Sequence, residues 1–253
     1  MQHRQISARG KALPYPAICA PLVARTSAQL VEECVAVAAK KPDLIEWRVD
    51  FFDAIGDAKQ VIDTARRLRS AAGAIPILFT RRHEREGGEK IGMAESKVIE
   101  LYRSVCESGF IDLVDYEMDN EPEHVQALRE TSRRAGLPLV MSFHDFRKTP
   151  AVDEIVQRFE RAASLGGDVA KVAVMPQSLD DVLALLTATS RASSSLSIPL
   201  VSMAMGPLGA VTRASGFVFG SAMTFAIGAS SSAPGQMPID DVRAVVDALK
   251  RAS

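Results

Sequence analysis

The sequence predicts an α/β fold, a single-domain (β/α)8 barrel over residues 1–253. Eight short runs rich in apolar residues alternate along the chain with segments that show helical periodicity. Eight such β-then-α units in about 250 residues are typical of this barrel. The main alternative is an open, doubly wound sheet, which usually carries a glycine fingerprint after its first strand. Residues 23–26 read Val-Ala-Arg-Thr and contain no glycine, so the barrel is favoured.

The predicted strands are the eight apolar runs. They lie at residues 17–22, 44–50, 76–82, 110–117, 138–146, 169–175, 199–206 and 220–226. Each run is six to nine residues long, which suits a strand buried on both faces better than a helix. The segment after each run is expected to form a helix on the outside of the barrel.

Local signals support several of these helices. Thr26 and Gln29 form a T-x-x-Q pattern that predicts a capped helix start. Thr149 followed by Pro150 predicts another start, because proline is favoured in the first helical position. In the last helix four apolar residues recur at the spacing of one helix face: Val242, Val245, Val246 and Leu249. Residues 193–195 are expected in a connection, and residues 229–236 in a flexible loop.

The composition argues against several classes of protein. A formal net charge of -1 gives no basic excess for binding nucleic acid. No apolar run approaches the ~20 residues of a membrane span, and residues 1–11 lack the apolar core of a secretory signal. Cys19, Cys34 and Cys106 lack metal-site spacing, so buried free thiols are expected rather than disulfides or a zinc site. We therefore expect a cytoplasmic protein with neither a nucleic-acid nor a membrane partner.

Polar residues interrupt five consecutive predicted strands. In residues 44–50, Glu46, Arg48 and Asp50 alternate with apolar residues, so the two sets face opposite sides of the strand. The apolar set suits the helix layer, and the charged set should point into the barrel. The same alternation places further polar residues inside: Thr80, Arg82, Asp115, Glu117, Ser142, His144 and Lys171. Most lie near the carboxyl ends of the strands, where barrel active sites lie. A purely structural salt-bridge network inside the barrel is the alternative.

Lys171 and His144 are the residues most indicative of chemistry. Lys171 lies among small apolar residues in Asp168-Val-Ala-Lys-Val-Ala-Val-Met175, where loss of water should favour the neutral, nucleophilic amine. The alternative is an ion pair with an acid such as Glu46 or Glu117. His144 lies one predicted strand away and can act as a general acid and base. No HExxH, P-loop or GxSxG pattern occurs, so no metal or cofactor is expected.

Six motifs resemble those of type I 3-dehydroquinate dehydratases. They are Glu46-Trp-Arg-Val-Asp50, Phe79-Thr-Arg-Arg82 with Glu86-Gly-Gly88, Ser142-Phe-His-Asp-Phe146, Lys171-Val-Ala-Val-Met-Pro176, Met205-Gly206 through Arg213, and Ser232-Ala-Pro-Gly-Gln236. They follow one another in register over nearly the whole chain. Two departures add charge around Arg82, namely Arg81 and His83; by alternation, Arg81 should face away from the site.

The resemblance implies a hydro-lyase of the shikimate pathway that eliminates water from 3-dehydroquinate, giving 3-dehydroshikimate. It implies that Lys171 forms a Schiff base with the substrate ketone. His144 would remove the proton from the adjacent carbon and later protonate the departing hydroxyl, and Glu86 would orient and tune His144. The substrate-binding residues implied are Arg213 for the carboxylate, with Ser232 and Gln236, and Glu46, Arg48 and Arg82 for the ring hydroxyls; apolar walls would come from Phe146, Met203, Met205 and Phe225.

The resemblance also implies a homodimer, and it leaves open whether the enzyme serves aromatic biosynthesis or quinate breakdown. Two other functions remain at this point. Another Schiff-base barrel enzyme, such as an aldolase, would share Lys171 but cleave a carbon–carbon bond. A non-catalytic barrel used for ligand binding or assembly would need none of this chemistry.

Overall fold

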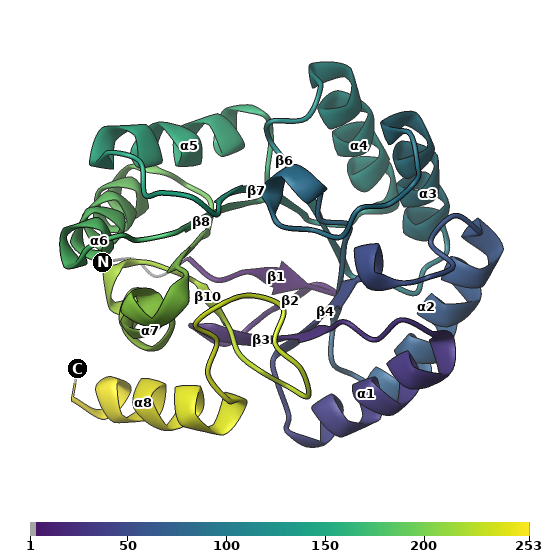
Figure 1. Cartoon of the computed structure of the whole chain (residues 1–253), viewed down its shortest axis with the longest axis horizontal. Coiled ribbons are helices and arrows are strands. Elements are labelled where there is room, and N and C mark those ends of the chain that lie inside the picture. Colours follow the sequence, from purple (N-terminus) through teal and green to yellow (C-terminus); the bar gives the residue numbers. More distant parts are fainter. Residues whose placement is uncertain (1–3, 253) are drawn as a thin grey trace.

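The computed structural model describes residues 4–252 and confirms the (β/α)8 barrel (Figure 1). Its eight parallel strands follow the order β10-β3-β4-β5-β6-β7-β8-β9. A bridge between Leu200 and Ser221 joins the segments of the two outer strands and closes the sheet. The strands are β3 (Ala17–Leu22), β4 (Leu44–Arg48), β5 (Ile77–Thr80), β6 (Leu113–Glu117), β7 (Leu139–Asp145), β8 (Val169–Val174), β9 (Leu200–Ala204) and β10 (Met223–Phe225).

Helices surround the strands on the outside (Figure 1). They are α1 (Ser27–Ala39), α2 (Ala58–Ala72), α3 (Glu95–Glu107), α4 (Pro122–Ala135), α5 (Val152–Ser164), α6 (Leu179–Ser195), α7 (Gly206–Ser215) and α8 (Ile239–Arg251). Three short 3-10 helices follow strands or helices: η1 (Val49–Phe51), η2 (Glu84–Glu86) and η3 (Gly216–Phe219). No helix within residues 4–252 is both long and apolar enough to cross a membrane.

The hydrophobic core has two layers, as the alternation of residues predicts. Ile45 and Trp47 belong to the larger layer between the sheet and the helices, whereas Leu44 belongs to the smaller layer inside the barrel. The inner layer contains Ala17, Leu78, Leu113, Val140, Val169 and Val201 in the amino-terminal half of the barrel. It also includes Met203, Met205 and Phe225, which lie beside buried polar side chains in the carboxyl-terminal half. Cys19, Cys34 and Cys106 are buried and free, as predicted.

A short antiparallel hairpin precedes the barrel and was absent from the sequence prediction. It comprises β1 (Ser7–Ala8) and β2 (Lys11–Ala12). Ile6, Ala8 and Leu13 are buried and pack into the inner core layer. The hairpin thus covers apolar side chains at the amino-terminal end of the barrel. Two-residue strands carry too little periodicity to be recognised in a sequence. Residues 1–3 and 253 belong to the predicted domain but lie outside the described residues. Residues 1–3 are also part of the segment 1–11 that was assessed for a secretory signal.

Several predicted boundaries were wrong. The strand predicted at 44–50 ends at Arg48, and Val49 and Asp50 lie in η1. Residues 193–195 form the last turn of α6 rather than a connection. Helix α5 begins at Val152 with Ala151 as its N-cap, so the Thr149–Pro150 signal does not start it. Proline disfavours a helical conformation in the residue before it but does not oblige the next residue to begin a helix.

The cap at Thr26 and the face of the last helix are partly confirmed. Thr26 is the N-cap of α1, and its side chain accepts from the Gln29 backbone N–H. The Gln29 side chain, however, accepts from the Thr26 hydroxyl, whereas in a capping box it would accept from the Thr26 backbone N–H. In α8, Val242 and Val246 are buried, whereas Val245 is 42% exposed. The packed face of α8 is therefore narrower than the apolar stripe in the sequence.

Candidate active site

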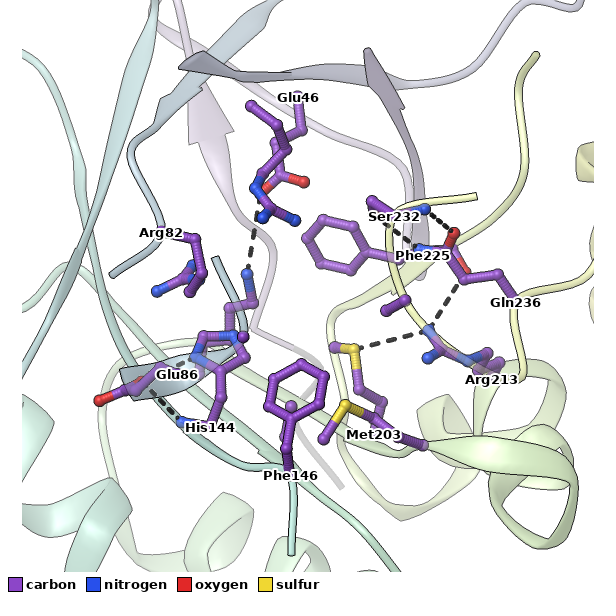
Figure 2. Close-up of a pocket in the computed structure, with 16 residues that line it drawn as sticks. Glu46, Arg82, Glu86, His144, Phe146, Met203, Arg213, Phe225, Ser232 and Gln236 are labelled. Atoms are coloured by element: carbon purple, nitrogen blue, oxygen red, sulfur yellow. Dashed lines mark hydrogen bonds and ion pairs between the residues drawn. The ribbon is translucent and has the colours of Figure 1, made fainter. Parts of the chain in front are cut away.

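A pocket lies at the carboxyl-terminal end of the barrel (Figure 2). All nine site residues predicted from the sequence line it: Glu46, Arg48, Arg82, Glu86, His144, Lys171, Arg213, Ser232 and Gln236. The four predicted apolar wall residues, Phe146, Met203, Met205 and Phe225, also line it. The pocket lining comes from loops and strand ends that are far apart in the sequence.

Strand pairing brings Lys171 and His144 to the same side of the barrel. In the register of β7 and β8, Ser142 lies opposite Lys171, and His144 lies opposite Ala173. Residues two apart in a strand share a face, so Lys171 and His144 both project inward at successive levels. The inward face predicted for these two strands is therefore confirmed.

Lys171 is buried and its amine has a carboxylate partner. Its Nζ lies 3.0 Å from Asp115 Oδ2, 3.9 Å from Glu46 Oε1 and 4.5 Å from the centre of the Phe225 ring. The sequence interpretation named Glu46 or Glu117 as the acid of such a pair. Asp115 is the closest, because the tilt of the strands carries it level with Lys171 from two strands away.

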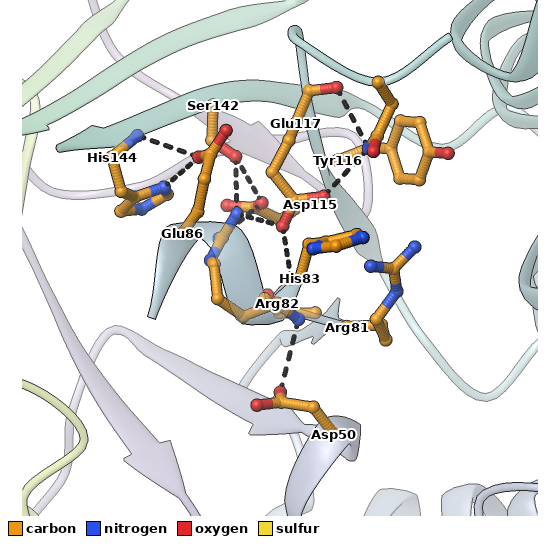
Figure 3. Close-up of polar contacts among 12 residues, drawn as sticks. Asp50, Arg81, Arg82, His83, Glu86, Asp115, Tyr116, Glu117, Ser142 and His144 are labelled. Atoms are coloured by element: carbon orange, nitrogen blue, oxygen red, sulfur yellow. Dashed lines mark hydrogen bonds and ion pairs between the residues drawn. The ribbon is translucent and has the colours of Figure 1, made fainter. Parts of the chain in front are cut away.

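Asp115 belongs to a network of buried charges beneath the pocket (Figure 3). Arg82 Nη2 lies 2.6 Å from Asp115, and Arg82 Nη1 lies 2.6 Å from Glu117 and 2.8 Å from Ser142 Oγ. Burial acts to raise the pKa of Asp115, but the cations Arg82 and Lys171 outweigh it and hold that pKa at about 2. The salt-bridge network considered from the sequence is therefore real, and it supports the pocket instead of filling it.

His144 and Glu86 form a hydrogen-bonded pair at the pocket wall. Glu86 Oε2 lies 2.9 Å from His144 Nδ1 and accepts the His144 backbone N–H at 2.8 Å. Since this oxygen is already an acceptor, we assign the ring proton to Nδ1, which leaves Nε2 free to accept a proton. Burial, Arg82 and Lys171 lower the pKa of His144 well below its ordinary value. Burial and the nearby Glu117 raise the pKa of Glu86 to about 8, against the attraction of Arg82.

Arg213 is the cation of the pocket that lacks an anionic partner. It is 2% exposed, and its donors reach the backbone oxygens of Pro234 at 3.0 Å and Phe225 at 3.4 Å. No carboxylate of residues 4–252 pairs with it, and its Nε has no hydrogen-bond partner within that range. Burial lowers the pKa of Arg213 to about 10. Because an unpaired buried charge is costly, the site is suited to an anionic ligand.

The segment between β10 and α8 brings Ser232 and Gln236 to the pocket. Gln236 accepts the Ser232 backbone N–H at 3.0 Å and donates to Ser232 Oγ at 3.2 Å. In Figure 2 these two side chains lie beside Arg213, whereas Glu86 and His144 lie on the other side of the pocket. An anion held by Arg213 would therefore lie within reach of this loop.

Arg81 faces away from the pocket, as the alternation predicts. It forms an ion pair with Glu95, and its guanidinium lies 6.0 Å from the centre of the Tyr116 ring. Its burial at 1% exposure is explained by that packing between β5 and α3. The additional charge beside Arg82 therefore belongs to the outer layer.

Neither Asp115 nor Glu117 lines the pocket, although both were correctly predicted to point inward.

A family profile described as type I 3-dehydroquinase matches residues 18–253. The chain belongs to the type I 3-dehydroquinase family. A 3-dehydroquinate dehydratase from Albidiferax ferrireducens is 52% identical over 250 residues, covering 99% of this chain and 94% of the relative. The crystal structure of a 3-dehydroquinate dehydratase from Geobacillus kaustophilus is 48% identical, with a TM-score of 0.96 over 99% of this chain and 98% of that one.

A second solved type I 3-dehydroquinate dehydratase, from Clostridium difficile, carries covalently modified comenic acid. It is 34% identical, with a TM-score of 0.95, and the similarity covers 100% of both chains. The family resemblance seen in the six sequence motifs is thus confirmed over almost the full length of this 3-dehydroquinase.

Proposed function

We propose that this chain dehydrates 3-dehydroquinate to 3-dehydroshikimate through an imine on Lys171. The observation that carries the proposal is the convergence of three groups on one pocket. The amine of Lys171 and the ring of His144 project from neighbouring strands into the pocket, and the unpaired Arg213 lies across the pocket from His144 (Figure 2). The full-length relatives named 3-dehydroquinate dehydratase support the same substrate.

Arg213 would bind the substrate carboxylate. Its guanidinium fits a planar carboxylate through two parallel hydrogen bonds, and that anion would supply its missing counter-charge. Ser232 and Gln236 would add hydrogen bonds from the loop. This end of the pocket fixes which way the substrate lies, with the ring directed toward Lys171.

Glu46, Arg48 and Arg82 would bind the ring hydroxyls. Arg82 uses both N–H groups of Nη1 for Glu117 and Ser142 and one of Nη2 for Asp115, so its Nε and the second N–H of Nη2 are left to donate to a ligand. Its larger contribution is to hold Asp115, which in turn directs the Lys171 amine. Phe146, Met203, Met205 and Phe225 would pack against the carbon ring.

The covalent step begins when Nζ of Lys171, once its ammonium group has released a proton to solvent, adds to the ketone carbon of the substrate. Loss of water from this adduct gives an iminium, which withdraws electrons from the adjacent carbon. His144 Nε2 then takes a proton from that carbon, and the electron pair of the broken C–H bond forms an enamine. A metal is not required for this proton loss, because the iminium is the electron sink.

The enamine expels the hydroxyl one carbon further along the ring. His144, now protonated, gives its proton to that oxygen, which leaves as water. A second water hydrolyses the conjugated imine, releases the enone product and restores the amine. The lowered pKa of His144 suits both transfers, because it makes the imidazole neutral before the reaction and a strong acid after it.

Glu86 would keep His144 in the correct tautomer throughout. Its Oε2 accepts from Nδ1, so Nε2 faces the substrate. The covalently modified comenic acid in the relative from Clostridium difficile supports covalent chemistry in this family.

We further propose that the enzyme acts as a cytoplasmic homodimer in the shikimate pathway. Three buried, free cysteines are consistent with a reducing compartment. Leu179 and Leu183 of α6, 67% and 59% exposed, are apolar surface available to a second copy. Sedimentation equilibrium tests this assembly, and a monomer at micromolar concentration would contradict it.

A direct assay tests the function. Purified enzyme and 3-dehydroquinate should produce the ultraviolet absorbance of a conjugated enone, and Lys171→Ala should not. An aldolase would instead release a smaller carbonyl fragment, detectable by mass spectrometry. Absence of enone with the wild-type enzyme would contradict the proposed function.

A further inference from the structure

Asp50 is a buried carboxylate that does not line the pocket yet binds two parts of its wall. It accepts Arg48 Nε at 2.9 Å with Oδ1 and Arg48 Nη2 at 2.7 Å with Oδ2. The same two oxygens accept the backbone N–H groups of Arg82 at 3.3 Å and Glu89 at 3.1 Å. Its side chain is 0% exposed. Four donors therefore converge on one group that solvent does not reach.

The first pair of contacts fixes the guanidinium of Arg48. Two parallel bonds to one carboxylate set both the position and the plane of the fork. Arg48 also lies 5.0 Å from the centre of the Phe51 ring. Its Nη1 is left without an acceptor among residues 4–252, and Arg48 lines the pocket. Asp50 thus leaves Nη1 and the second N–H of Nη2 to donate to a ligand.

The second pair of contacts holds both ends of the segment that carries Glu86. Arg82 precedes this segment and Glu89 ends it, and Figure 3 shows Asp50 below the Arg82 backbone. The turn between them is tightly packed: a Cβ on Gly87 would lie 2.3 Å from the Phe146 ring, and one on Gly88 would lie 1.9 Å from the Arg82 carbonyl oxygen. A turn packed this closely transmits a shift at its ends to Glu86.

We propose that Asp50 is a positioning residue that sets Arg48 for the substrate and Glu86 for His144 at the same time. It does so from its place in η1, directly after the strand that carries Arg48. The inference rests on the proposed function for the reaction that is measured. The alternative is that Asp50 only satisfies buried N–H groups and has no specific effect on turnover.

The test uses Asp50→Asn, which keeps the shape but replaces one acceptor oxygen with a donor. That donor would face an N–H of Arg48 together with the backbone N–H of either Arg82 or Glu89. We expect KM to rise and kcat to fall, each by about tenfold, as for the loss of one charge-assisted hydrogen bond. The acid limb of the pH profile of kcat should shift, because Glu86 moves relative to His144.

Double variants separate the two effects. With Arg48→Ala already present, Asp50→Asn should no longer raise KM but should still lower kcat. With Glu86→Gln present, it should raise KM and leave both kcat and the acid limb unaltered. Interacting residues show such non-additivity, whereas independent ones do not. Additive effects in both backgrounds, together with an unshifted pH profile, would overturn the proposal.

Asp112→Asn is the matched control. Asp112 is a buried aspartate that accepts Arg69 at 2.6 Å and the Ile77 backbone N–H at 2.7 Å, but it lies at the start of β6, away from the pocket. Asp112→Asn should lower Tm without changing KM or the pH profile.

Should Asp50→Asn fail to fold, Asp50→Glu retains the charge and displaces it by one methylene. The same changes in KM and kcat are expected, and wild-type kinetics in a folded Asp50→Glu variant would overturn the proposal.

The outcome also distinguishes this proposal from the proposed function. If the wild type and Asp112→Asn both fail to dehydrate 3-dehydroquinate, the function is wrong. If they are active and Asp50→Asn matches them, only the role of Asp50 is wrong.

Discussion

Replacing Arg213 with lysine removes one of two hydrogen bonds to the proposed carboxylate while keeping a positive charge. The loss of one charge-assisted bond costs about 1.5–3 kcal/mol. Since about 1.4 kcal/mol is a factor of ten, kcat/KM should fall about 10- to 150-fold. The present partners of Arg213 are backbone oxygens at 3.0 and 3.4 Å and Met203 Sδ at 3.7 Å, none of which replaces a carboxylate. Most of the loss should appear in KM, because the carboxylate is bound before and after the chemical step.

Arg213→Met separates binding from folding. Methionine gives an unbranched apolar side chain in place of the arginine. The substitution thus removes a buried cation that has no anionic partner among residues 4–252. Removing such a charge should not lower Tm, whereas kcat/KM should fall further than for lysine. Arg243→Lys is the control, because Arg243 also bonds to backbone oxygens but lies in α8, with a side chain 36% exposed.

The assay is steady-state formation of the enone, with Tm measured by calorimetry on the same samples. Unchanged KM and kcat in Arg213→Lys would remove Arg213 from the substrate site. A large loss of Tm in Arg213→Met would instead assign it a structural role.

Four further predictions concern the His144–Glu86 pair and the loop. His144→Ala should reduce kcat by about 10²–10⁴-fold while still forming a borohydride-trappable imine; near wild-type turnover would mean that another group is the base. Because burial lowers the pKa of His144 from 6.5, kcat/KM should fall only below that pH, and an acid limb centred above it would contradict this. The folded pKa of Glu86, about 8, exceeds its ordinary 4.5. Between pH 4.5 and pH 8 the folded state keeps the Glu86 proton and the unfolded state does not, so the free energy of unfolding falls as the pH rises through this range. The Tm of the wild type, relative to that of Glu86→Gln, should therefore decrease as the pH rises. A Tm difference that stays constant with pH would refute the raised pKa of Glu86. Amides of residues 230–236 should exchange hydrogen faster without ligand than with it, as for a lid, and equal rates would count against a lid.

The barrel and the inward polar residues could be predicted because both depend on a two-residue alternation that is local in sequence. Glu46 and Arg48 alternate with Ile45 and Trp47, and the structure places the two sets on opposite faces. The motifs then identified the loop residues, which have no periodicity of their own. Ser232 and Gln236 could be assigned only through the family resemblance.

Partner identities could not be predicted, because they depend on the tilt of the strands and on short irregular segments. Asp115, rather than Glu46 or Glu117, is the nearest acid to Lys171. Asp50 was assigned to a strand, but its 3-10 turn directs it to backbone N–H groups of another loop. Neither contact leaves a signal in the residues next to it.

Reduction of the proposed imine on Lys171 tests the central claim most directly. Borohydride converts an imine to a stable secondary amine, so enzyme treated with substrate or product and borohydride should lose activity and gain the mass of one reduced ligand. Peptide mapping should locate that mass on Lys171, which is 3% exposed in the pocket, and not on the exposed Lys148. Lys171→Ala should gain no mass. Dehydration of 3-dehydroquinate without any trapped adduct, or with the adduct on another lysine, would contradict the covalent mechanism.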